Sequence, residues 1–187
     1  MDRRSIIISG PPAVGKTTVA KAVAKRFGLR MYGGGDALKE LAASRGYTPT
    51  GSEWWDTPEG LRFLAERAAN PEYDRKVDQM LIEALKQGSV VVTSYTLPWL
   101  TDYGIKIWLK ASVESRAKRM ANRDRISYDA ALSIVKKRDE ENRSLYFKIY
   151  GIEFGQDLSV FDLVLNTDIL SRDAVVEVVE VFVKRFV

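Results

Sequence analysis

The chain has 187 residues, 45% of them hydrophobic and 29% charged, with a formal net charge of +4. This length and composition predict one globular domain with a sizeable core. The chain has no cysteine and no histidine, which excludes disulfides, thiolate metal sites and histidine bases. Any metal is therefore predicted to be a hard, oxygen-preferring ion such as Mg²⁺.

No apolar run approaches the roughly 20 residues that a membrane-spanning helix needs, and the first residues are typical of a strand, not of a signal peptide. We therefore expect a cytoplasmic protein with no membrane partner. The excess of 29 Lys and Arg over 25 Asp and Glu is compatible with nucleic acid or with small phosphates. The sequence lacks a strand that interleaves basic and aromatic residues for base stacking, which favours small nucleotides as partners.

Short β-branched runs without alternation predict strands that are covered on both faces of a parallel sheet. These runs are SIIIS (5–9), SVVVTS (89–94), IKIWLK (105–110) and FDLVLN (161–166), with a weaker fifth strand at 29–32. Helical patterns lie between them, at 17–27, 37–44, 58–69, 72–86, 113–123, 128–149 and 172–186. Strands that alternate with helices predict a doubly wound α/β fold.

A glycine-rich turn, 33–36, follows the weak strand, and we expect Asp36 to cap the next helix. From there to residue 87 the pattern is helical apart from the irregular segment 46–58. A helical insertion between the second and third strands indicates a subdomain above the sheet.

The segment GPPAVGKT follows the first predicted strand and precedes a helix. Gly10, Gly15, Lys16 and Thr17 complete the P-loop pattern GxxxxGK[ST], in which backbone N–H groups and a helix N-terminus bind phosphates. Lys16 is predicted to reach the β- and γ-phosphates and the Thr17 hydroxyl to hold Mg²⁺. The predicted ATP-binding loop consists of Gly10, Pro11, Pro12, Ala13, Val14, Gly15, Lys16, Thr17 and Thr18.

The P-loop alone does not separate kinases from GTPases and ATPases. The chain has neither the NKxD nor the DxxG motif of a GTPase. Its size, its helical insertion and a late basic segment favour a small phosphotransferase, in which one site holds ATP and a facing site holds the acceptor.

Several longer segments resemble one family. GPPAVGKTTVAKAVAKRFGL, YGGGDALKELA, IKIWLKASVESRAKRMANRD and KRDEENRSLYFKIYGIEF are similar to cytidylate kinases of the short archaeal type, within the nucleoside monophosphate kinases. The resemblance implies a P-loop kinase domain over 1–187 with a five-stranded parallel sheet. It also implies a monophosphate-binding helical insertion at about 36–87 and an arginine-bearing lid at about 123–150. The implied reaction is transfer of the γ-phosphoryl group of ATP to CMP or dCMP with Mg²⁺.

The resemblance also implies roles for individual residues. It places Arg138 and Arg143 in the lid as catalytic groups beside Lys16, and Arg119 and Arg123 at the ATP site. On the acceptor side it implies Asp36, Lys39, Arg75, Tyr95 and Asp139. Asp139 is expected either to hold Arg138 in place or to help bind the acceptor.

Three positions depart from the family pattern on the acceptor side. Tyr95 stands where an arginine grips the acceptor's phosphate, Lys39 where arginine is usual, and Leu145 in place of a further lid arginine. Lysine cannot make the planar two-bond contact of arginine with phosphate. Two other readings therefore stay open: a P-loop kinase of the same build with another small acceptor, and a non-catalytic nucleotide-binding regulatory or RNA-associated protein.

Two further features allow alternatives. The segment 46–67 carries Trp54 and Trp55, which either pack the insertion onto the domain or line a base-stacking wall. The C-terminal helix is apolar nearly all round, so it is either deeply packed or shared with a second subunit. The sequence is compatible with a monomer or a homodimer.

Overall fold

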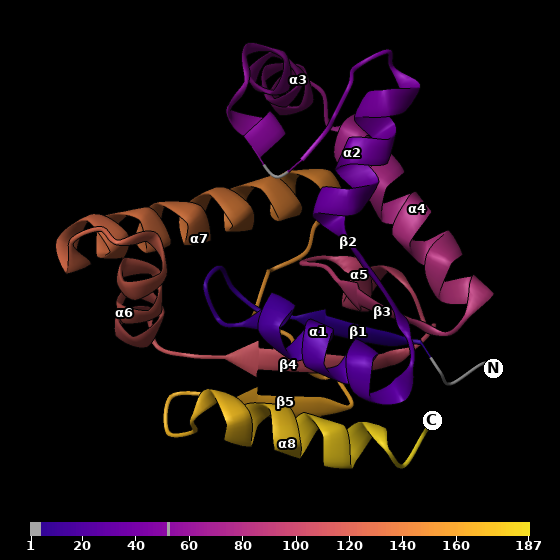
Figure 1. The fold of residues 1–187 in the computed structure, drawn as a ribbon, viewed down its shortest axis with the longest axis vertical. Coiled ribbons are helices and arrows are strands. Elements are labelled where there is room, and N and C mark those ends of the chain that lie inside the picture. The colour runs from indigo at the N-terminus through magenta and orange to yellow at the C-terminus, as the bar shows by residue number, and fades with distance from the viewer. Residues whose placement is uncertain (1–4, 52) are drawn as a thin grey trace.

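A computed structural model describes residues 5–51 and 53–187. Five strands form one parallel sheet in the order β2-β3-β1-β4-β5 (Figure 1). The strands are β1 (Ile6–Ser9), β2 (Arg30–Gly33), β3 (Val90–Thr93), β4 (Ile105–Lys110) and β5 (Leu163–Asn166). The predicted α/β fold with a parallel sheet is confirmed. Residues 1–4 and 52, the last of them inside the irregular segment 46–58, lie outside the described residues.

All the helical patterns in the sequence form helices. They are α1 (Lys16–Phe27), α2 (Gly34–Ser44), α3 (Pro58–Ala69), α4 (Glu72–Gln87), α6 (Val113–Asp124), α7 (Tyr128–Tyr150) and α8 (Arg172–Val183). Two short elements were not predicted, the 3-10 helix η1 (Glu53–Asp56) and α5 (Leu97–Leu100). Each is about one turn long, which is too short to show a helical period.

Side-chain caps set where several helices begin. Thr57, Ser112, Ser127 and Ser171 each precede a helix and accept a hydrogen bond from the backbone N–H three residues later. Such a cap satisfies one of the helix's free N–H groups. Gly151 ends α7 in the left-handed conformation, with φ +68°, where glycine is favoured.

The start of α2 differs from the prediction. Asp36 was expected to cap this helix, but the helix begins at Gly34 and Gly33 is the N-cap. Asp36 is the third helical residue, and its carboxylate accepts a hydrogen bond from the Gly33 backbone N–H at 2.8 Å. The helix thus begins two residues before Asp36, and the Asp36 carboxylate satisfies the N-cap N–H from within the first turn.

Successive residues of β1 face opposite layers of helices, as the two-residue period of a strand requires. Ile6 and Ile8 pack in one core cluster with Val23 of α1 and Val179 of α8. Ile7 packs in a second cluster with residues of α2 and α4. The sheet therefore has a core on each face at its centre.

The edge strand β5 was expected to be covered on both faces, and that expectation is wrong. Its residues alternate between half-buried and exposed. Leu163 and Leu165 pack against the α1–α8 cluster, whereas 40% of Val164 is exposed. Among the described residues, no further strand pairs with β5, and the helices cover only one of its faces.

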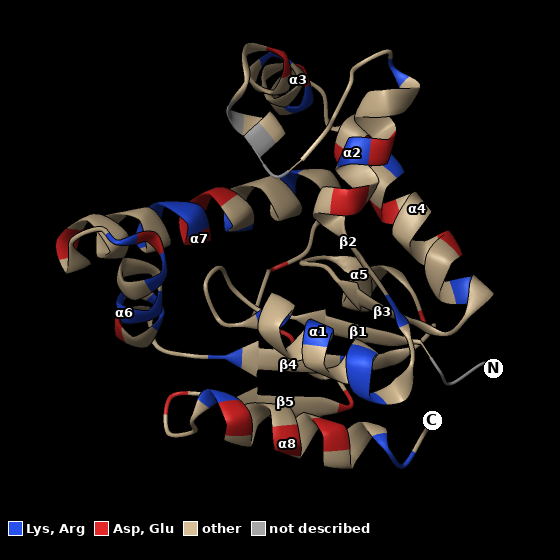
Figure 2. Cartoon of the chain, in the orientation of Figure 1, with Lys and Arg blue, Asp and Glu red and all other residues tan. Residues whose placement is uncertain are grey.

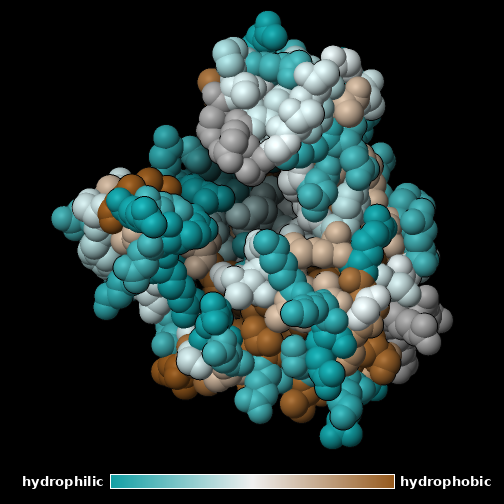
Figure 3. Space-filling view, in the orientation of Figure 1, coloured by the Kyte–Doolittle hydropathy of each residue, from teal (hydrophilic) through white to brown (hydrophobic). Residues whose placement is uncertain are grey.

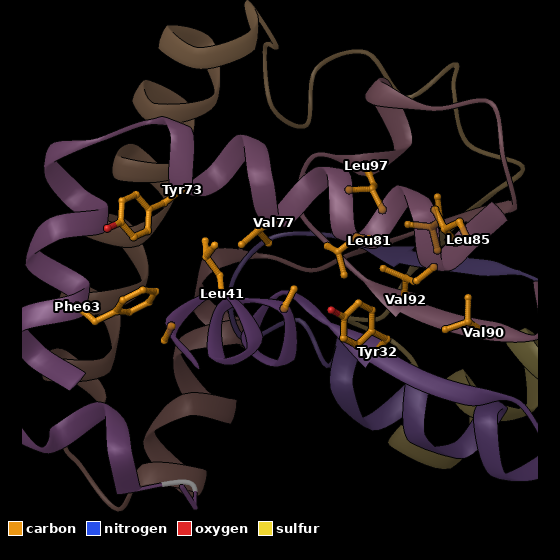
Figure 4. Packing of buried hydrophobic residues seen from close by; sticks show 14 of the residues in the cluster. Tyr32, Leu41, Phe63, Tyr73, Val77, Leu81, Leu85, Val90, Val92 and Leu97 are labelled. Atoms are coloured by element: carbon orange, nitrogen blue, oxygen red, sulfur yellow. The ribbon is translucent and has the colours of Figure 1, made fainter. Parts of the chain in front are cut away.

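The helical insertion has an aromatic core that is continuous with the sheet. Figure 4 shows Phe63 and Tyr73 packed beside Leu41, with Leu81 and Val92 further along the same cluster. Trp54 belongs to this cluster and is 3% exposed. Its indole N–H donates to the Glu59 carboxylate at 2.7 Å. The packing alternative for Trp54 is therefore confirmed.

The carboxyl ends of the strands all lie at one edge of the sheet, because the strands are parallel. Helices α6 and α7 form a hairpin beside this edge, and α7 runs across it toward α2 and α4 (Figure 1). Open α/β sheets bind their ligands at this edge. Among the described residues, no helix has the length and apolar character needed to cross a membrane.

The contact between α3 and η1 generates a stability prediction. A Cβ added at Gly60 would lie 2.1 Å from the backbone oxygen of Trp54, so Gly60→Ala must displace one helix from the other. We expect a loss of about 2 to 3 kcal/mol, at the upper end of the usual cost of overpacking. Thermal unfolding measures it, with Gly35→Ala as the control, because a Cβ there meets nothing within 4 Å. An unchanged melting temperature for Gly60→Ala would contradict this packing.

Candidate active site

The loop after β1 has a backbone that only glycine adopts easily. Gly10 has φ +143°, and a Cβ at this position would lie 2.2 Å from the Leu109 backbone oxygen on the neighbouring strand β4. Gly15 has φ +108° and precedes α1 directly. Val14, between them, is buried at 3% exposure and joins the core below the loop. The loop is therefore held in this conformation by the packing of Gly10 against β4 on one side and by the start of α1 on the other.

Lys16 lies at the centre of this loop. Its Nζ donates to the backbone oxygens of Gly10 at 2.8 Å and Pro11 at 2.9 Å. The same Nζ lies 4.3 Å from the centre of the Tyr95 ring, within cation–π range. Burial, with a smaller effect from the positive charges of Arg138 and Arg116, lowers the pKa of Lys16 to about 7. An anion beside Nζ would restore the charge.

Two cavities meet at Lys16. One has a volume of about 980 Å³ and the other about 830 Å³, and both fall in the usual range for small-molecule sites. Lys16, Thr17, Tyr95 and Arg138 line both. Figure 3 shows the surface hollowed between the helical insertion, the α6–α7 hairpin and the P-loop. The site thus offers two binding spaces with one shared wall.

The larger cavity lies between the P-loop, α6 and the start of α8. Arg119 and Arg123 line it, as the resemblance implied. Arg119 donates to the Val14 backbone oxygen at 3.2 Å and to the backbone oxygen of Thr167 at 2.7 Å, so it ties α6 to the loop and to the end of β5. Arg123 is exposed and pairs with Asp124 at 2.6 Å. Figure 2 shows Lys and Arg concentrated on α6.

Arg116 has a structural role that the sequence reasoning missed. It is 3% exposed and makes a two-bond ion pair with Asp139 of α7, at 2.8 and 2.7 Å. The same guanidinium donates to the Pro12 backbone oxygen at 3.2 Å. Asp139 thus contacts Arg116, and through it the P-loop. The helical spacing of 116, 119 and 123 was visible in the sequence, but nothing in it identified the member that would be buried.

The two lid arginines occupy different positions on α7. Arg138 lines both cavities, with Nη2 3.5 Å from the Tyr95 hydroxyl. Arg143 lines neither; it is exposed, with Nη1 3.9 Å from the Glu140 carboxylate. The predicted pair is therefore not brought together in this conformation, and a catalytic role for Arg143 stays a prediction that requires the lid to move.

The smaller cavity lies between the P-loop, the N-terminus of α2, the α3–α4 region and α7. It includes residues that the sequence analysis did not assign to a site: Gly34, Gly35, Arg67, Asp74, Asp78, Ser94, Asn142, Tyr146 and Lys148. Arg138, Asn142 and Tyr146 follow one another at i, i+4 spacing on α7, which places them on one helix face. That spacing was readable from the sequence once the helix was identified.

The residues that were predicted to bind the acceptor do not all lie at the smaller cavity. Of these, Tyr95 lines the smaller cavity, whereas Asp36, Lys39, Arg75 and Asp139 do not. Lys39 donates to the Gly51 backbone oxygen and lies 5.7 Å from the Trp55 ring centre. Arg75 is exposed and pairs with Glu72. Contact of these residues with an acceptor stays a prediction.

A buried carboxylate, Asp78, also lines the smaller cavity. It is 8% exposed, and its two oxygens accept hydrogen bonds from Thr96 at 2.9 Å and Tyr150 at 2.6 Å. Burial raises its pKa to about 6, although both hydroxyls oppose this shift. Of the charged groups that act on it, Asp74 adds to the rise in its pKa and Arg67 reduces it.

Thr17 is the predicted protein ligand for Mg²⁺, and it lines both cavities at the first turn of α1. In the part of the chain that the structure describes, no group of three or more His, Cys, Asp and Glu gathers as a metal site. A hydroxyl beside a phosphate loop suits Mg²⁺, which usually keeps several waters and takes its other ligands from substrate phosphates.

The fold and the loop define the class of protein. Similar folds occur in an uncharacterized protein from Eubacterium ventriosum, with TM-score 0.70, 16% identity and coverage of 98% of this chain and 99% of that one. Shikimate kinase from Bacteroides thetaiotaomicron matches with TM-score 0.59, 14% identity and coverage of 96% and 98%. The chain has the fold of a P-loop kinase.

Sequence comparison gives the family. The model of the cytidylate kinase-like family matches residues 5–169. Cytidylate kinase from Pyrobaculum aerophilum is 41% identical over 91% of this chain and 88% of its own. Cytidylate kinase from Ignicoccus hospitalis is 36% identical over 94% of this chain and 96% of its own. The chain belongs to the cytidylate kinase-like family, and the resemblance noted in the sequence is confirmed.

Asp78 generates a pH prediction for stability. Because its pKa in the folded chain lies above the ordinary value of 3.8, the stabilisation from its protonated form is complete below about pH 4 and is lost as the pH rises through about 6. Asp78→Asn removes the buried charge and keeps the shape. We expect the variant to be more stable than the parent by up to about 3 kcal/mol at pH 8, from roughly 1.4 kcal/mol for each pKa unit.

Urea unfolding at pH 8, 6 and 4 measures this difference. The advantage of Asp78→Asn should shrink with falling pH and vanish near pH 4. A stability difference that stays constant over this range would show that Asp78 does not titrate in this way.

Proposed function

We propose that the protein transfers the γ-phosphoryl group of ATP to a nucleoside monophosphate, CMP or dCMP, to give the diphosphate and ADP. The observation that carries this proposal is the meeting of two cavities at Lys16, Tyr95 and Arg138. A phosphoryl group that moves from one ligand to another needs such a shared wall, which positions both ligands and surrounds the moving group with positive charge. Relatives named cytidylate kinase support CMP as the acceptor.

In this assignment the larger cavity holds ATP. The P-loop N–H groups and the N-terminus of α1 bind its phosphates. Arg119 keeps α6 against the P-loop. Arg123 lies at the cavity wall and faces the bound ATP. Thr17 would hold Mg²⁺, which would supply positive charge to offset that of the ATP phosphates.

Lys16 exchanges its partners when ATP binds. Its ammonium group leaves the two backbone oxygens of Gly10 and Pro11 for the β- and γ-phosphates. Two carbonyl oxygens are weaker partners for a cation than a phosphate is. Arg138 approaches the transferring group from α7 and stabilises the charge that develops on its oxygens.

The smaller cavity takes the acceptor, with its phosphate near Lys16 and Arg138. Tyr95 replaces the usual phosphate-gripping arginine, and other donors lie along the same wall. Gly34 and Gly35 place the first turn of α2 at the cavity, where a helix N-terminus favours an anion. These groups, together with Arg138, compensate for the missing arginine in this proposal.

The proposed organisation is one kinase domain with an acceptor-binding insertion and a lid. Residues from about 36 to 87 form the insertion, and residues from about 123 to 150, at the end of α6 and along α7, form the lid. A catalytic role for Arg143 requires closure of the lid, because in this conformation Arg143 is exposed and lines neither cavity. Such closure excludes water from the transfer step.

A second candidate function keeps the fold and the ATP site but has another small acceptor. The observation that favours it is Tyr95, a neutral group at the position where the family grips the acceptor's phosphate. An acceptor with less phosphate to hold would suit that wall. The two candidates differ in which acceptor causes release of ADP.

The acceptor assay is the direct test. ADP release from Mg·ATP is measured with CMP, dCMP, UMP, AMP and GMP added singly. We expect turnover with CMP or dCMP. Lys16→Ala should lower turnover at least about 100-fold, and Arg138→Ala should lower kcat more than ATP affinity.

The control is Lys118→Ala on α6, because Lys118 is exposed and lines neither cavity; this variant should retain full turnover. ATP binding without turnover on any monophosphate would reject the proposed acceptor class.

The pKa of Lys16 generates a second prediction. It is about 7 without nucleotide, so much of the group is neutral at pH 8, and phosphate beside it favours the charged form. ATP binding at pH 8 should therefore take up close to one proton. Calorimetry in two buffers with different ionisation enthalpies measures this uptake. Lys16→Arg is the control, since arginine is always charged; identical enthalpies for the parent chain in both buffers would contradict the prediction.

A further inference from the structure

Tyr95 lies where the two cavities meet, and it contacts two cationic side chains that line both of them. The Lys16 ammonium group lies over its ring, with Nζ 4.3 Å from the ring centre. The Tyr95 hydroxyl oxygen lies 3.5 Å from Arg138 Nη2, in position to accept a hydrogen bond. One neutral side chain therefore touches the P-loop lysine with its ring and the α7 arginine with its hydroxyl group.

The backbone of Tyr95 is tied to the start of the P-loop. Tyr95 follows the end of β3 by two residues, and Ser9, the last residue of β1, donates from Oγ to the Tyr95 backbone oxygen at 3.2 Å. Ser94 Oγ accepts hydrogen bonds from the backbone N–H groups of Thr96 and Leu97, both at 3.2 Å. A side chain that bonds the following N–H groups fixes a turn locally. The ends of β1 and β3 thus set the place of the Tyr95 ring.

The Tyr95 ring also packs against aromatic residues of the lid and of the segment after it. The Tyr146 ring on α7 lies 5.9 Å from the Tyr95 ring, and the Phe154 ring lies 5.8 Å from it. Leu145 packs against the same apolar cluster. Positions 95 and 145, where this chain lacks an arginine of the family pattern, therefore lie in one cluster. Such a cluster accommodates a tyrosine ring, whereas a guanidinium would lose its water there.

The charges around Lys16 explain why a neutral partner matters. Arg138 of α7 and Arg116 of α6 repel its ammonium group, and Asp139 of α7 attracts it. An arginine at position 95 would add a further positive charge at this point. Tyrosine instead offers an electron-rich ring face to one cation and an acceptor oxygen to the other. These two contacts offset part of the repulsion between Lys16 and Arg138 at the junction of the cavities.

We propose that Tyr95 is a positioning residue that holds the Lys16 ammonium group and the Arg138 guanidinium at the point of phosphoryl transfer. This inference rests on the proposed function, since it concerns the groups that surround the same transferring phosphoryl group. It gives Tyr95 a task other than gripping the acceptor's phosphate, because Tyr95 acts through the two cations. Misplacing such cations slows the transfer more than it weakens the binding of either ligand.

Two substitutions separate the ring from the hydroxyl group. Tyr95→Phe keeps the ring over Lys16 and removes the contact with Arg138, so kcat with CMP and Mg·ATP should fall about threefold to tenfold. Tyr95→Leu removes both contacts and should lower kcat about tenfold further. Steady-state kinetics should show KM values for CMP and ATP that each change less than about threefold, because the lost contacts act on the transition state.

A double-mutant cycle tests whether the hydroxyl group acts through Arg138. In the Arg138→Ala background, Tyr95→Phe has no guanidinium to position and should change kcat less than about twofold. A purely structural role of the hydroxyl group would give the same loss in both backgrounds. Tyr95→Phe keeps the aromatic packing, so this cycle decides the question even if Tyr95→Leu does not fold.

Tyr103 provides matched controls. It is 44% exposed, Lys86 Nζ lies 5.9 Å from its ring centre, and it lines neither cavity. Tyr103→Phe and Tyr103→Leu make the same chemical changes beside another lysine. Both variants should leave kcat and both KM values unchanged.

The outcomes separate the two proposals. A parent chain that is inactive with every monophosphate contradicts the proposed function, and this inference falls with it. In a parent chain that uses CMP, three results overturn the inference alone: a parental kcat in Tyr95→Phe, a loss in Tyr95→Phe that persists in the Arg138→Ala background, or a loss that lies in KM and not in kcat.

Discussion

The close approach of the β1–α1 loop to strand β4 is the constraint on which the site depends. Gly10 lies so near the Leu109 backbone oxygen that no side chain fits, and its φ of +143° turns the chain back over the end of the sheet. That turn places the N-terminus of α1, and with it Lys16, at the junction of the two cavities. A packing requirement between two neighbouring strands thus determines where phosphates can bind.

The parts of the site that follow from local chain geometry were predictable from the sequence. The P-loop pattern lies between a β-branched run and an amphipathic helix, and each step of that prediction uses residues close together in the chain. Ser112 and Ser127 likewise mark the starts of α6 and α7 through local hydrogen bonds. Strand and helix positions were therefore recoverable to within a few residues.

The parts that depend on contacts between distant segments were not predictable. Arg116 and Asp139 are 23 positions apart, and only the packing of α6 against α7 shows that they pair. Arg67 and Asp74 lie on two helices whose relative placement no local pattern specifies. Lys39 and Arg75 are a second case: charge and motif position suggested an acceptor role, neither residue lines the cavity in this conformation, and the role stays a prediction.

One face of α7 borders both cavities. Arg138, Asn142 and Tyr146 lie along it at four-residue intervals, and Arg138 lines both cavities while the other two line the smaller one. Since a helix moves as a unit, a ligand in one cavity that shifts α7 also reshapes the other. Thermodynamic reciprocity then requires that donor and acceptor change each other's affinity by the same factor. Under the proposed function, any coupling between ATP and its acceptor that acts through α7 would be measured as this one reciprocal factor.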